Sequence, residues 1–306
     1  MTTDRVPASV LAPMARRDDG AEHRVVSAPL PAPTADAVDR PVFDRLLLTG
    51  AAGGLGRELR PRLRRLARAL RLSDVAEMAP AGAGEEVMTA ALQDAAAVDR
   101  IVAGSDAVVH LGGISTEGPF APILEANIVG VWHLYEAARR HGVKRVVFAS
   151  SNHVTGFYRQ DEVIAPGDPM RPDGHYGLSK AFGENVARFY FDRYGIESVC
   201  LRIGSSFPEP KDRRMLATWL SYDDLERLIV ASLTATIVGC SVVYGVSDNT
   251  TTWWDNTSAS HLGFRPQDSS ERFRAAAEAR QPVLDSRDPA TIFQGGAFVK
   301  QGPFER

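Results

Sequence analysis

The polar pair most suggestive of chemistry is Tyr176 and Lys180, in the stretch Tyr-Gly-Leu-Ser-Lys. On a helix, residues four apart lie on one face, one turn apart. A free tyrosine has a pKa of about 10 and is a poor base at neutral pH. A nearby lysine ammonium favours the phenolate, so Lys180 is expected to lower the pKa of Tyr176. The pair therefore predicts a tyrosine base that takes the proton of a substrate hydroxyl, although this spacing is common in proteins and has that meaning only in a suitable context.

A second polar group follows the apolar run Val-Val-Phe-Ala. It consists of Ser150, Ser151, Asn152 and His153. The run is short and rich in β-branched residues, which predicts a strand, and carboxyl ends of parallel strands face the ligand crevice of such sheets. Together with Tyr176 and Lys180, this position favours site residues over serines that merely cap the strand.

A glycine-rich turn supplies the context for the pair. The apolar run Leu46–Leu48 leads into Gly50, Gly53 and Gly56 and then into an amphipathic helix. Gly50 permits a tight turn, Gly53 lets the backbone approach a pyrophosphate, and Gly56 lets the helix lie close to the strand. The helix N-terminus favours the phosphates. A plain turn is the alternative, but it would not need the strand before it and the amphipathic helix after it, so we expect a bound dinucleotide. The oxidised nicotinamide ring of that dinucleotide would also favour the phenolate of Tyr176.

The next strand ends at Asp74, and a carboxylate there can accept both ribose hydroxyls of the adenosine half. It would repel a 2′-phosphate, and the neighbouring Val75 offers no compensating charge. The sequence therefore predicts NAD rather than NADP.

The elements that must position these residues alternate along the chain. Six short apolar runs are predicted as strands: 45–50, 69–75, 106–113, 145–151, 198–204 and 240–246. Helical stretches lie between them, the first with an apolar stripe from Leu55 to Leu70 and with Pro61 expected to bend it. This alternation predicts an α/β fold, a Rossmann-like doubly wound parallel sheet with a small C-terminal substrate-binding part.

Residues 1–42 differ from the rest, because they are rich in proline and contain no Phe, Tyr or Trp. Such a segment buries too little apolar surface to offset its ordering entropy, so we expect a disordered tail. We expect residues 43–306 to form a single dehydrogenase domain, with the substrate-binding elements mainly in 205–306.

Composition excludes several classes of function. The chain has 306 residues, 35 Lys and Arg against 38 Asp and Glu, and a net charge of −3, which disfavours nucleic acid. No run approaches the ~18–20 apolar residues of a membrane span, and no signal peptide is visible, so we expect a cytoplasmic protein that binds no membrane. The two cysteines and seven histidines show no metal-ligand spacing, and His110 is interpreted as a strand histidine with its hydrogen bonds satisfied.

The spacing Gly-x-x-Gly-x-x-Gly, together with Tyr176 and Lys180, resembles the short-chain dehydrogenase/reductase superfamily. The resemblance implies that Ser151 hydrogen-bonds the reacting hydroxyl and that Asn127 steadies the active-site lysine through water. It also implies that Lys180 holds the nicotinamide ribose. The NAD contacts that it implies are Gly50, Gly53, Gly54, Leu55, Gly56, Asp74, Leu92, Leu111, Gly112, Gly113, Asn127, Ser150, Tyr176, Lys180 and Ile203.

Longer blocks narrow the resemblance to the bacterial uronate dehydrogenases. They cover essentially all of 43–306 and include LGGIS (111–115), FASSNHVTG (148–156), RPDGHYGLSK (171–180), RIGSSFPEP (202–210), RMLATW (214–219) and FQGGAFV (293–299). The resemblance implies oxidation of C1 of cyclic D-galacturonate or D-glucuronate to the aldarolactone, with NAD. The substrate contacts that it implies are Ser115, Ser151, Asn152, His153, Ser205 and Arg214.

Arg214 agrees chemically with such a substrate, because a guanidinium can give a bidentate fork to the C6 carboxylate. A structural ion pair is the alternative, and the adjacent Arg213 competes for the role. The sequence departs from the superfamily at Ala91, where an aspartate near the adenine is usual, although the backbone of Leu92 can still contribute. We also expect a homo-oligomer.

Two other functions fit parts of the pattern. A nucleotide-sugar epimerase or dehydratase shares the fold, the glycine turn and the Tyr176–Lys180 pair, but the short chain after Arg202 favours a smaller substrate. A non-catalytic NAD-sensing regulator would often lose the tyrosine or the lysine, and this chain has both.

Overall fold

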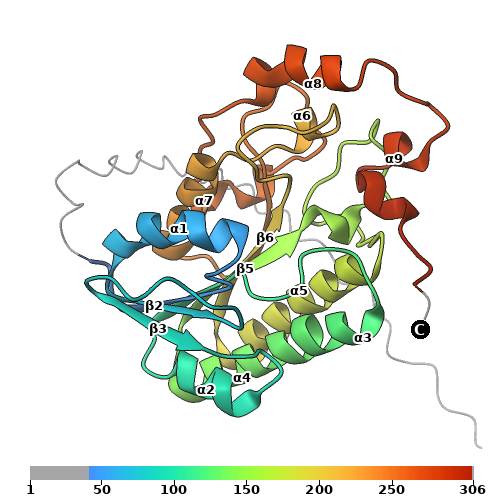
Figure 1. Cartoon of the computed structure of the whole chain (residues 1–306). Coiled ribbons are helices and arrows are strands. Elements are labelled where there is room, and N and C mark those ends of the chain that lie inside the picture. Colours follow the sequence, from blue (N-terminus) through green and yellow to red (C-terminus); the bar gives the residue numbers. More distant parts are fainter. Residues whose placement is uncertain (1–40, 305–306) are drawn as a thin grey trace, which may run out of the picture. The chain divides into compact units, whose positions relative to one another are not determined.

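The computed structural model describes residues 41–304. Its centre is one sheet of seven parallel strands in the order β3-β2-β1-β4-β5-β6-β7 (Figure 1). The strands are β1 (Phe43–Thr49), β2 (Ala67–Asp74), β3 (Glu85–Thr89), β4 (Ala107–His110), β5 (Arg145–Ser151), β6 (Glu197–Ile203) and β7 (Cys240–Gly245). The predicted Rossmann-like fold is confirmed. Residues 1–40 of the expected tail lie outside the described residues, so the tail and the domain boundary stay predictions.

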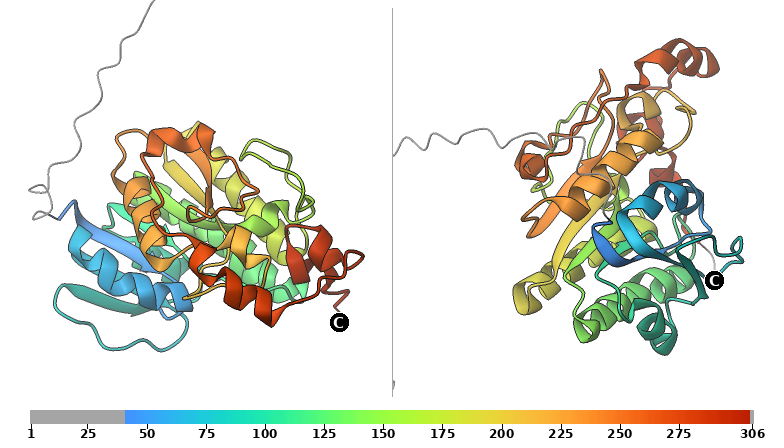
Figure 2. Two further views of the ribbon diagram at one scale, coloured as in Figure 1. Left: turned by 90° about the horizontal axis from the view of Figure 1, so that it is seen from above. Right: turned by 90° about the vertical axis from the view of Figure 1, so that its left-hand side faces the viewer.

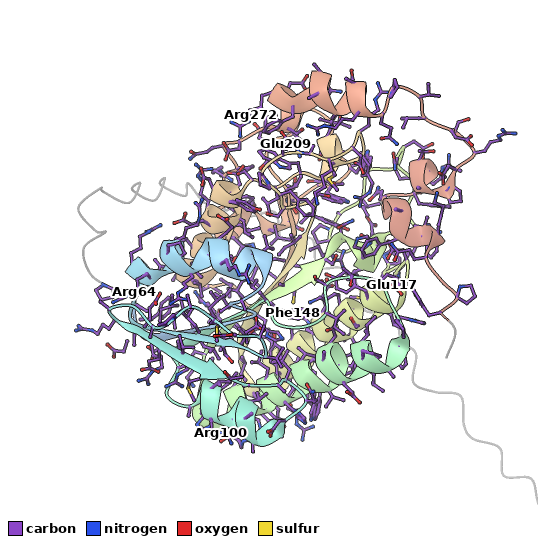
Figure 3. All side chains as sticks on the ribbon, viewed as in Figure 1. Arg64, Arg100, Glu117, Phe148, Glu209 and Arg272 are labelled. Atoms are coloured by element: carbon purple, nitrogen blue, oxygen red, sulfur yellow. The ribbon has the colours of Figure 1, made fainter. Side chains whose placement is uncertain are left out.

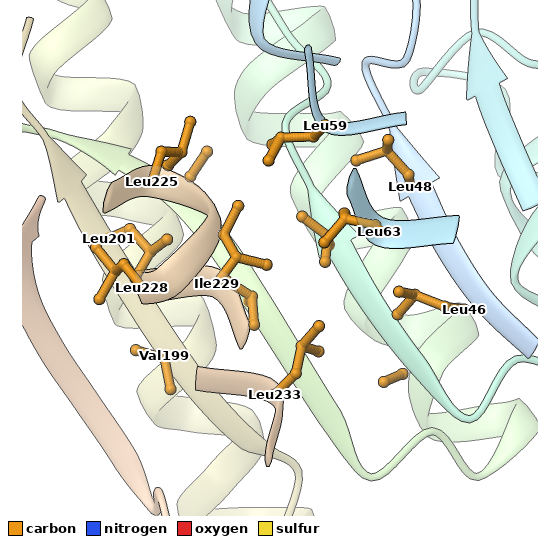
Figure 4. Close-up of a cluster of buried hydrophobic side chains, with 14 of the residues drawn as sticks. Leu46, Leu48, Leu59, Leu63, Val199, Leu201, Leu225, Leu228, Ile229 and Leu233 are labelled. Carbon is orange, nitrogen blue, oxygen red and sulfur yellow. The ribbon is translucent and has the colours of Figure 1, made fainter. Parts of the chain in front are cut away.

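Helices cover both faces of the sheet because successive side chains of a strand point to opposite faces. Leu46 and Leu48 of β1 pack with α1 and α7, as Figure 4 shows, whereas Leu47 packs with the cluster that includes α2, α4 and α5. The two helix layers are visible on either side of the strands in Figure 1. The helices are α1 (Gly54–Leu63), α2 (Ala95–Val102), α3 (Phe120–Ile123), α4 (Gly130–His141), α5 (His175–Tyr194), α6 (Met215–Thr218), α7 (Tyr222–Thr234), α8 (Arg274–Arg280) and α9 (Pro289–Ile292).

The order of the strands fixes where a ligand can bind. β1 lies between β2 and β4, so the chain leaves β1 in one direction for β2 and β3 and later returns on its other side to β4. A crevice opens at such a switch point, at the carboxyl ends of the strands. The glycine turn follows β1, and residues 111–115 follow β4, which brings both predicted cofactor stretches to that crevice.

Two details differ from the sequence prediction. Strand β3 was not predicted, because it is an edge strand with only Val87 and Met88 as strongly apolar residues. The first helix ends at Leu63, so Leu66 lies in a 3₁₀ turn and Leu70 lies in β2. The regular leucine spacing therefore continues from helix α1 into strand β2, because both elements bury leucines against the same core.

The helices α6, α8 and α9 gather at one end of the described chain, away from α2 and α4 (Figures 1 and 2). Within residues 41–304, no helix has the length and apolar character to cross a membrane. No group of three or more His, Cys, Asp or Glu side chains in that part of the chain is arranged to hold a metal ion.

Candidate active site

A cleft of about 930 Å³ lies at the carboxyl ends of the strands, near the upper end of the range of small-molecule sites. Its walls include nearly every residue that the sequence predicts for the site. The exception is Asn127, which lies behind the wall. The cleft therefore brings together predicted residues from eight separate segments of the chain.

The glycine turn has the geometry that phosphate binding requires. Gly50 has a φ of +71°, and a Cβ on Gly56 would lie 2.1 Å from the carbonyl oxygen of Gly50. Any side chain at Gly56 would therefore push the helix away from the strand. Helix α1 begins at Gly54, and its free N–H groups face the cleft side of the turn, where an anion is favoured.

Asp74 is tied to this turn. Its Oδ2 accepts a hydrogen bond from the backbone N–H of Ala52 at 2.9 Å, and its Oδ1 accepts one from Ala76 at 3.0 Å. A carboxylate oxygen has two lone pairs, so both oxygens can still accept from ribose hydroxyls. The carboxylate is thus held in place for the role that the sequence predicts.

Replacing Asp74 by Asn is expected to bring kcat/KM with NADP closer to that with NAD. The variant removes the charge that repels a 2′-phosphate, while the amide oxygen can still accept from Ala52. Asp74→Ala should narrow the gap as well, but with weaker binding of both cofactors because the turn loses its hydrogen bonds. The matched control is Asp94→Asn, which alters the cap of α2. An unchanged NADP-to-NAD ratio in Asp74→Asn would contradict the role of this charge.

The adenine end differs from the usual pattern as the sequence indicated. Ala91, Leu92 and Gln93 line the cleft. The carbonyl oxygen of Leu92 already contacts the Nδ1 of His133 at 3.0 Å. The polar side chain available here is that of Gln93, which the sequence analysis did not single out.

Tyr176 and Lys180 lie on α5 and are both buried. The Nζ of Lys180 lies 5.1 Å from the ring centre of Phe148, which Figure 3 labels, and 5.7 Å from that of Tyr176. Burial raises the pKa of Tyr176 to about 12, partly opposed by a hydrogen bond with Ser151 and assisted by the negative charge of Asp173. Burial lowers the pKa of Lys180 to about 8.

In the protein by itself burial therefore dominates the pKa of Tyr176, and the lowering expected from Lys180 together with an oxidised nicotinamide stays a prediction. Loss of water disfavours the charged form of each group. A phenolate needs positive charge beyond that of the lysine. His110, below the site, stays neutral, because burial and the charge of Lys180 lower its pKa to about 3. Its Nδ1 bonds to the hydroxyl of Thr49 at 2.7 Å.

The buried lysine should cost stability, and the cost should depend on pH. In the folded protein the pKa of Lys180 is about 8, below the ordinary 10.5. Below pH 8 the lysine is therefore protonated in both the folded and the unfolded protein, and the folded protein is destabilised by the buried charge. Between those values the unfolded state binds more protons, so stability rises with pH. Lys180→Met should therefore be more stable than the parent at pH 7, by up to roughly 3 kcal/mol at about 1.4 kcal/mol per pKa unit.

Thermal unfolding from pH 7 to 10.5 measures this effect. The gain of Lys180→Met should shrink as the pH rises through that range, whereas Lys144→Met, at an exposed lysine, should show no such trend. A gain independent of pH would point to packing rather than charge.

The remaining predicted residues have definite partners. Ser150 donates to the buried carboxylate of Glu184 at 2.5 Å, and Glu184 pairs with buried Arg202 at 2.9 Å. Asn127, in a π-helical turn, accepts from the N–H of Ile114 and donates to the Ile114 carbonyl and the Ser179 hydroxyl. Both amide hydrogens are thus engaged, so the side chain anchors the loop after β4, and the expected water-mediated link to Lys180 stays a prediction.

Arg214 has a half-buried guanidinium without a carboxylate partner in residues 41–304. Its Nε donates to the carbonyl of Gln294 at 2.6 Å, and burial lowers its pKa. With the Asn152 amide turned so that its nitrogen donates to Ile203, its oxygen accepts from an Arg214 NH₂ group at 2.9 Å. Arg213 instead pairs with Glu278 at 3.6 Å and does not line the cleft, so of the two adjacent arginines the structure favours Arg214 as the substrate contact.

Comparison with known proteins gives a consistent result. The sequence profile of the NAD dependent epimerase/dehydratase family matches residues 46–236. A uronate dehydrogenase of Pseudomonas syringae pv. tomato is 63% identical over 263 residues, covering 86% of this chain and 95% of that enzyme. The chain belongs to the uronate dehydrogenase family.

Solved structures of this family have the same fold. The crystal structure of uronate dehydrogenase from Agrobacterium tumefaciens is 52% identical, covers 86% of this chain and 99% of that one, and has a TM-score of 0.84. A mutant of that enzyme complexed with NAD is 51% identical, with the same coverage and TM-score.

Three further residues contribute to the site of this member of the uronate dehydrogenase family and were not predicted from the sequence. Glu117 accepts from the backbone N–H groups of His175 and Tyr176 at 2.8 and 2.9 Å, so it caps α5 from the loop after β4; Figure 3 labels it. Phe298 stacks on the ring of His153. Asp173 bonds to the Nδ1 of the same ring. Each contact joins segments far apart in the sequence, so no local pattern predicts it.

Proposed function

We propose that this protein is an NAD-dependent uronate dehydrogenase that oxidises the C1 hydroxyl of cyclic D-galacturonate or D-glucuronate to the aldarolactone. The observation that carries the proposal is the guanidinium of Arg214, which has no carboxylate partner among residues 41–304 and lies in the same cleft as Ser151, Tyr176 and Lys180. A cation that is partly removed from water gains from a carboxylate partner, and a uronate supplies that carboxylate.

Each side chain of the site has a separate role in this proposal. Ser151 orients the C1 hydroxyl, Tyr176 takes its proton, and Lys180 favours the phenolate and holds the nicotinamide ribose. Arg214 and Asn152 hold the C6 end of the sugar. When bound, NAD would supply the hydride acceptor for C1 and a positive charge beside Tyr176, and that charge would offset the burial that raises the tyrosine pKa.

The fit of NAD to this chain rests on the glycine turn, the start of α1 and the fixed carboxylate of Asp74. The cleft continues from these residues past Gly112 and Gly113 to Tyr176. A dinucleotide laid along it would bring its nicotinamide end to the proposed base.

The full chain incubated with NAD and galacturonate or glucuronate should produce NADH, followed by its absorbance. Parallel reactions with galactose, glucose and UDP-glucose test the neighbouring functions. Turnover of uronates far above that of the neutral sugars supports the proposal. Conversion of the nucleotide sugar instead would favour an epimerase or dehydratase, and binding of NAD without any turnover would favour a regulator.

We also propose a homo-oligomer, formed through the outer face of α4 and α5. Trp132, Phe189 and Tyr194 expose large aromatic surfaces there, and the rings of Trp132 and Phe189 lie 6.3 Å apart. An exposed apolar patch of this kind is typical of contact surfaces between protein chains.

Light scattering should show more than one copy of the chain per particle, and Trp132→Glu should shift the protein toward the monomer. A monomeric parent would contradict this proposal.

A further inference from the structure

Asp173 precedes helix α5 and lies outside the residues proposed to touch substrate. Its side chain is fully buried. Oδ2 lies 2.6 Å from the Nδ1 of His153, and the backbone N–H of Asp173 donates to the carbonyl of His153 at 3.3 Å. Two independent contacts thus tie Asp173 to the residue that follows the Ser151–Asn152 pair.

The first contact determines which ring nitrogen of His153 carries hydrogen. A carboxylate has no hydrogen to donate, so the hydrogen between Oδ2 and Nδ1 belongs to the imidazole. In the neutral ring this leaves Nε2 with a free lone pair. His153 lines the cleft, and Nε2 has no hydrogen-bond partner within residues 41–304.

The surrounding chain holds this pair rigidly. Phe298 stacks on the His153 ring with centres 3.9 Å apart and planes 15° apart. Three glycines from separate segments close on the carboxylate: a Cβ on Gly156, Gly177 or Gly295 would lie 1.9, 3.1 or 2.0 Å from its oxygens. Neither the ring nor the carboxylate has room to turn.

The arrangement is not one that stability alone explains. Oδ1 of Asp173 is buried and has no hydrogen-bond partner in the described part of the chain. A buried acceptor without a partner is costly. We therefore attribute the burial of this carboxylate to the contact that Oδ2 makes with His153.

We propose that Asp173 is a positioning residue that fixes His153 with hydrogen on Nδ1, so that Nε2 accepts a hydrogen bond from a ring hydroxyl of the substrate. The identity of the substrate as a uronate rests on the proposed function, whereas the state of the ring does not. A hydroxyl that donates to Nε2 is fixed in direction, which restricts the sugar orientations that the cleft admits.

Asp173→Asn tests the proposal, because its amide can donate to Nδ1 and so move the ring hydrogen to Nε2. We expect KM for the uronate to rise at least tenfold, with the NAD dissociation constant unchanged within twofold. Nitrogen NMR of the histidine rings at pH 9 should show His153 with hydrogen on Nδ1 in the parent and on Nε2 in the variant. This second measurement needs no turnover.

Two controls separate positioning from a structural role. Asp161→Asn, at an exposed carboxylate paired with Arg159, should change neither KM nor the His153 signals. In a His153→Ala background, Asp173→Asn should raise KM by less than twofold, because its effect acts through the ring.

Hydrogen on Nε2 in the parent, or a full tenfold effect of Asp173→Asn without His153, would overturn the proposal. A parent that shows the expected ring state but oxidises no uronate would overturn the proposed function and leave the ring assignment standing.

Discussion

Tyr176→Phe is expected to reduce kcat with uronates by a factor of about 10³ or more while NAD binding is retained. The substitution removes one hydroxyl from a buried ring and so removes the proton acceptor without opening a cavity. General base catalysis by a positioned group contributes typically about 10²–10⁴-fold. Steady-state kinetics and calorimetric titration with NAD measure the two quantities.

The fold should be unaffected, because the aromatic ring and its contacts with His153 and Phe298 are preserved. Tyr194→Phe is the matched control, since Tyr194 lies on the same helix but is exposed. Its kcat should stay within twofold of the parent. Turnover of Tyr176→Phe within tenfold of the parent would remove Tyr176 from the role of base.

The prediction also has a pH component. Burial holds the pKa of Tyr176 at about 12 in the protein alone, so the phenolate fraction increases with pH across the neutral range. We therefore expect kcat/KM of the parent to rise from pH 6 toward pH 8. The residual activity of Tyr176→Phe should lack this rise, because the group that titrates is gone.

The sequence predicted those parts of the site that local patterns encode. Gly50, Gly56 and Asp74 occupy positions relative to a strand and a helix that nearly dictate their roles. Tyr176 and Lys180 share one turn of α5. Strand β3 was missed because an edge strand half open to solvent lacks the apolar run of a central one.

The parts that could not be predicted depend on tertiary contacts. Gly295, Ala297 and Phe298 reach the cleft only because the chain returns there after α8 and α9. The carbonyl of Gln294 then orients Arg214, and Phe298 covers His153. The high pKa of Tyr176 in the protein alone could not be predicted for a related reason, since the sequence shows the neighbouring charge but not the depth of burial that opposes it.

Arg214→Ala is the second large effect and the one that is most diagnostic of substrate class. If the guanidinium holds the C6 carboxylate, its loss removes a charge-assisted interaction of roughly 2–5 kcal/mol. At about 1.4 kcal/mol per factor of ten, kcat/KM with uronates should fall by between about 30-fold and several thousand-fold. The loss with galactose or glucose should be much smaller, because these sugars have no carboxylate.

Two companion variants define the cause. Arg214→Lys should rescue only part of the activity, because an ammonium lacks the planar fork that binds a carboxylate through two hydrogen bonds. Arg213→Ala, at the adjacent arginine that pairs with Glu278 outside the cleft, should keep kcat/KM within a few-fold of the parent. The comparison of neighbours separates a local charge effect from a general loss of positive charge.

NAD affinity provides the deciding control. Arg214 contacts Gln294 and Asn152, which lie at the substrate end of the cleft, so its removal should leave the NAD dissociation constant nearly unchanged. Parallel loss of NAD binding and uronate turnover would mean that Arg214 supports the cofactor or the fold. The carboxylate would then have to be held by Ser205, Asn152 and backbone donors. That outcome would preserve the family assignment, but it would remove the electrostatic reason for a uronate in this cleft.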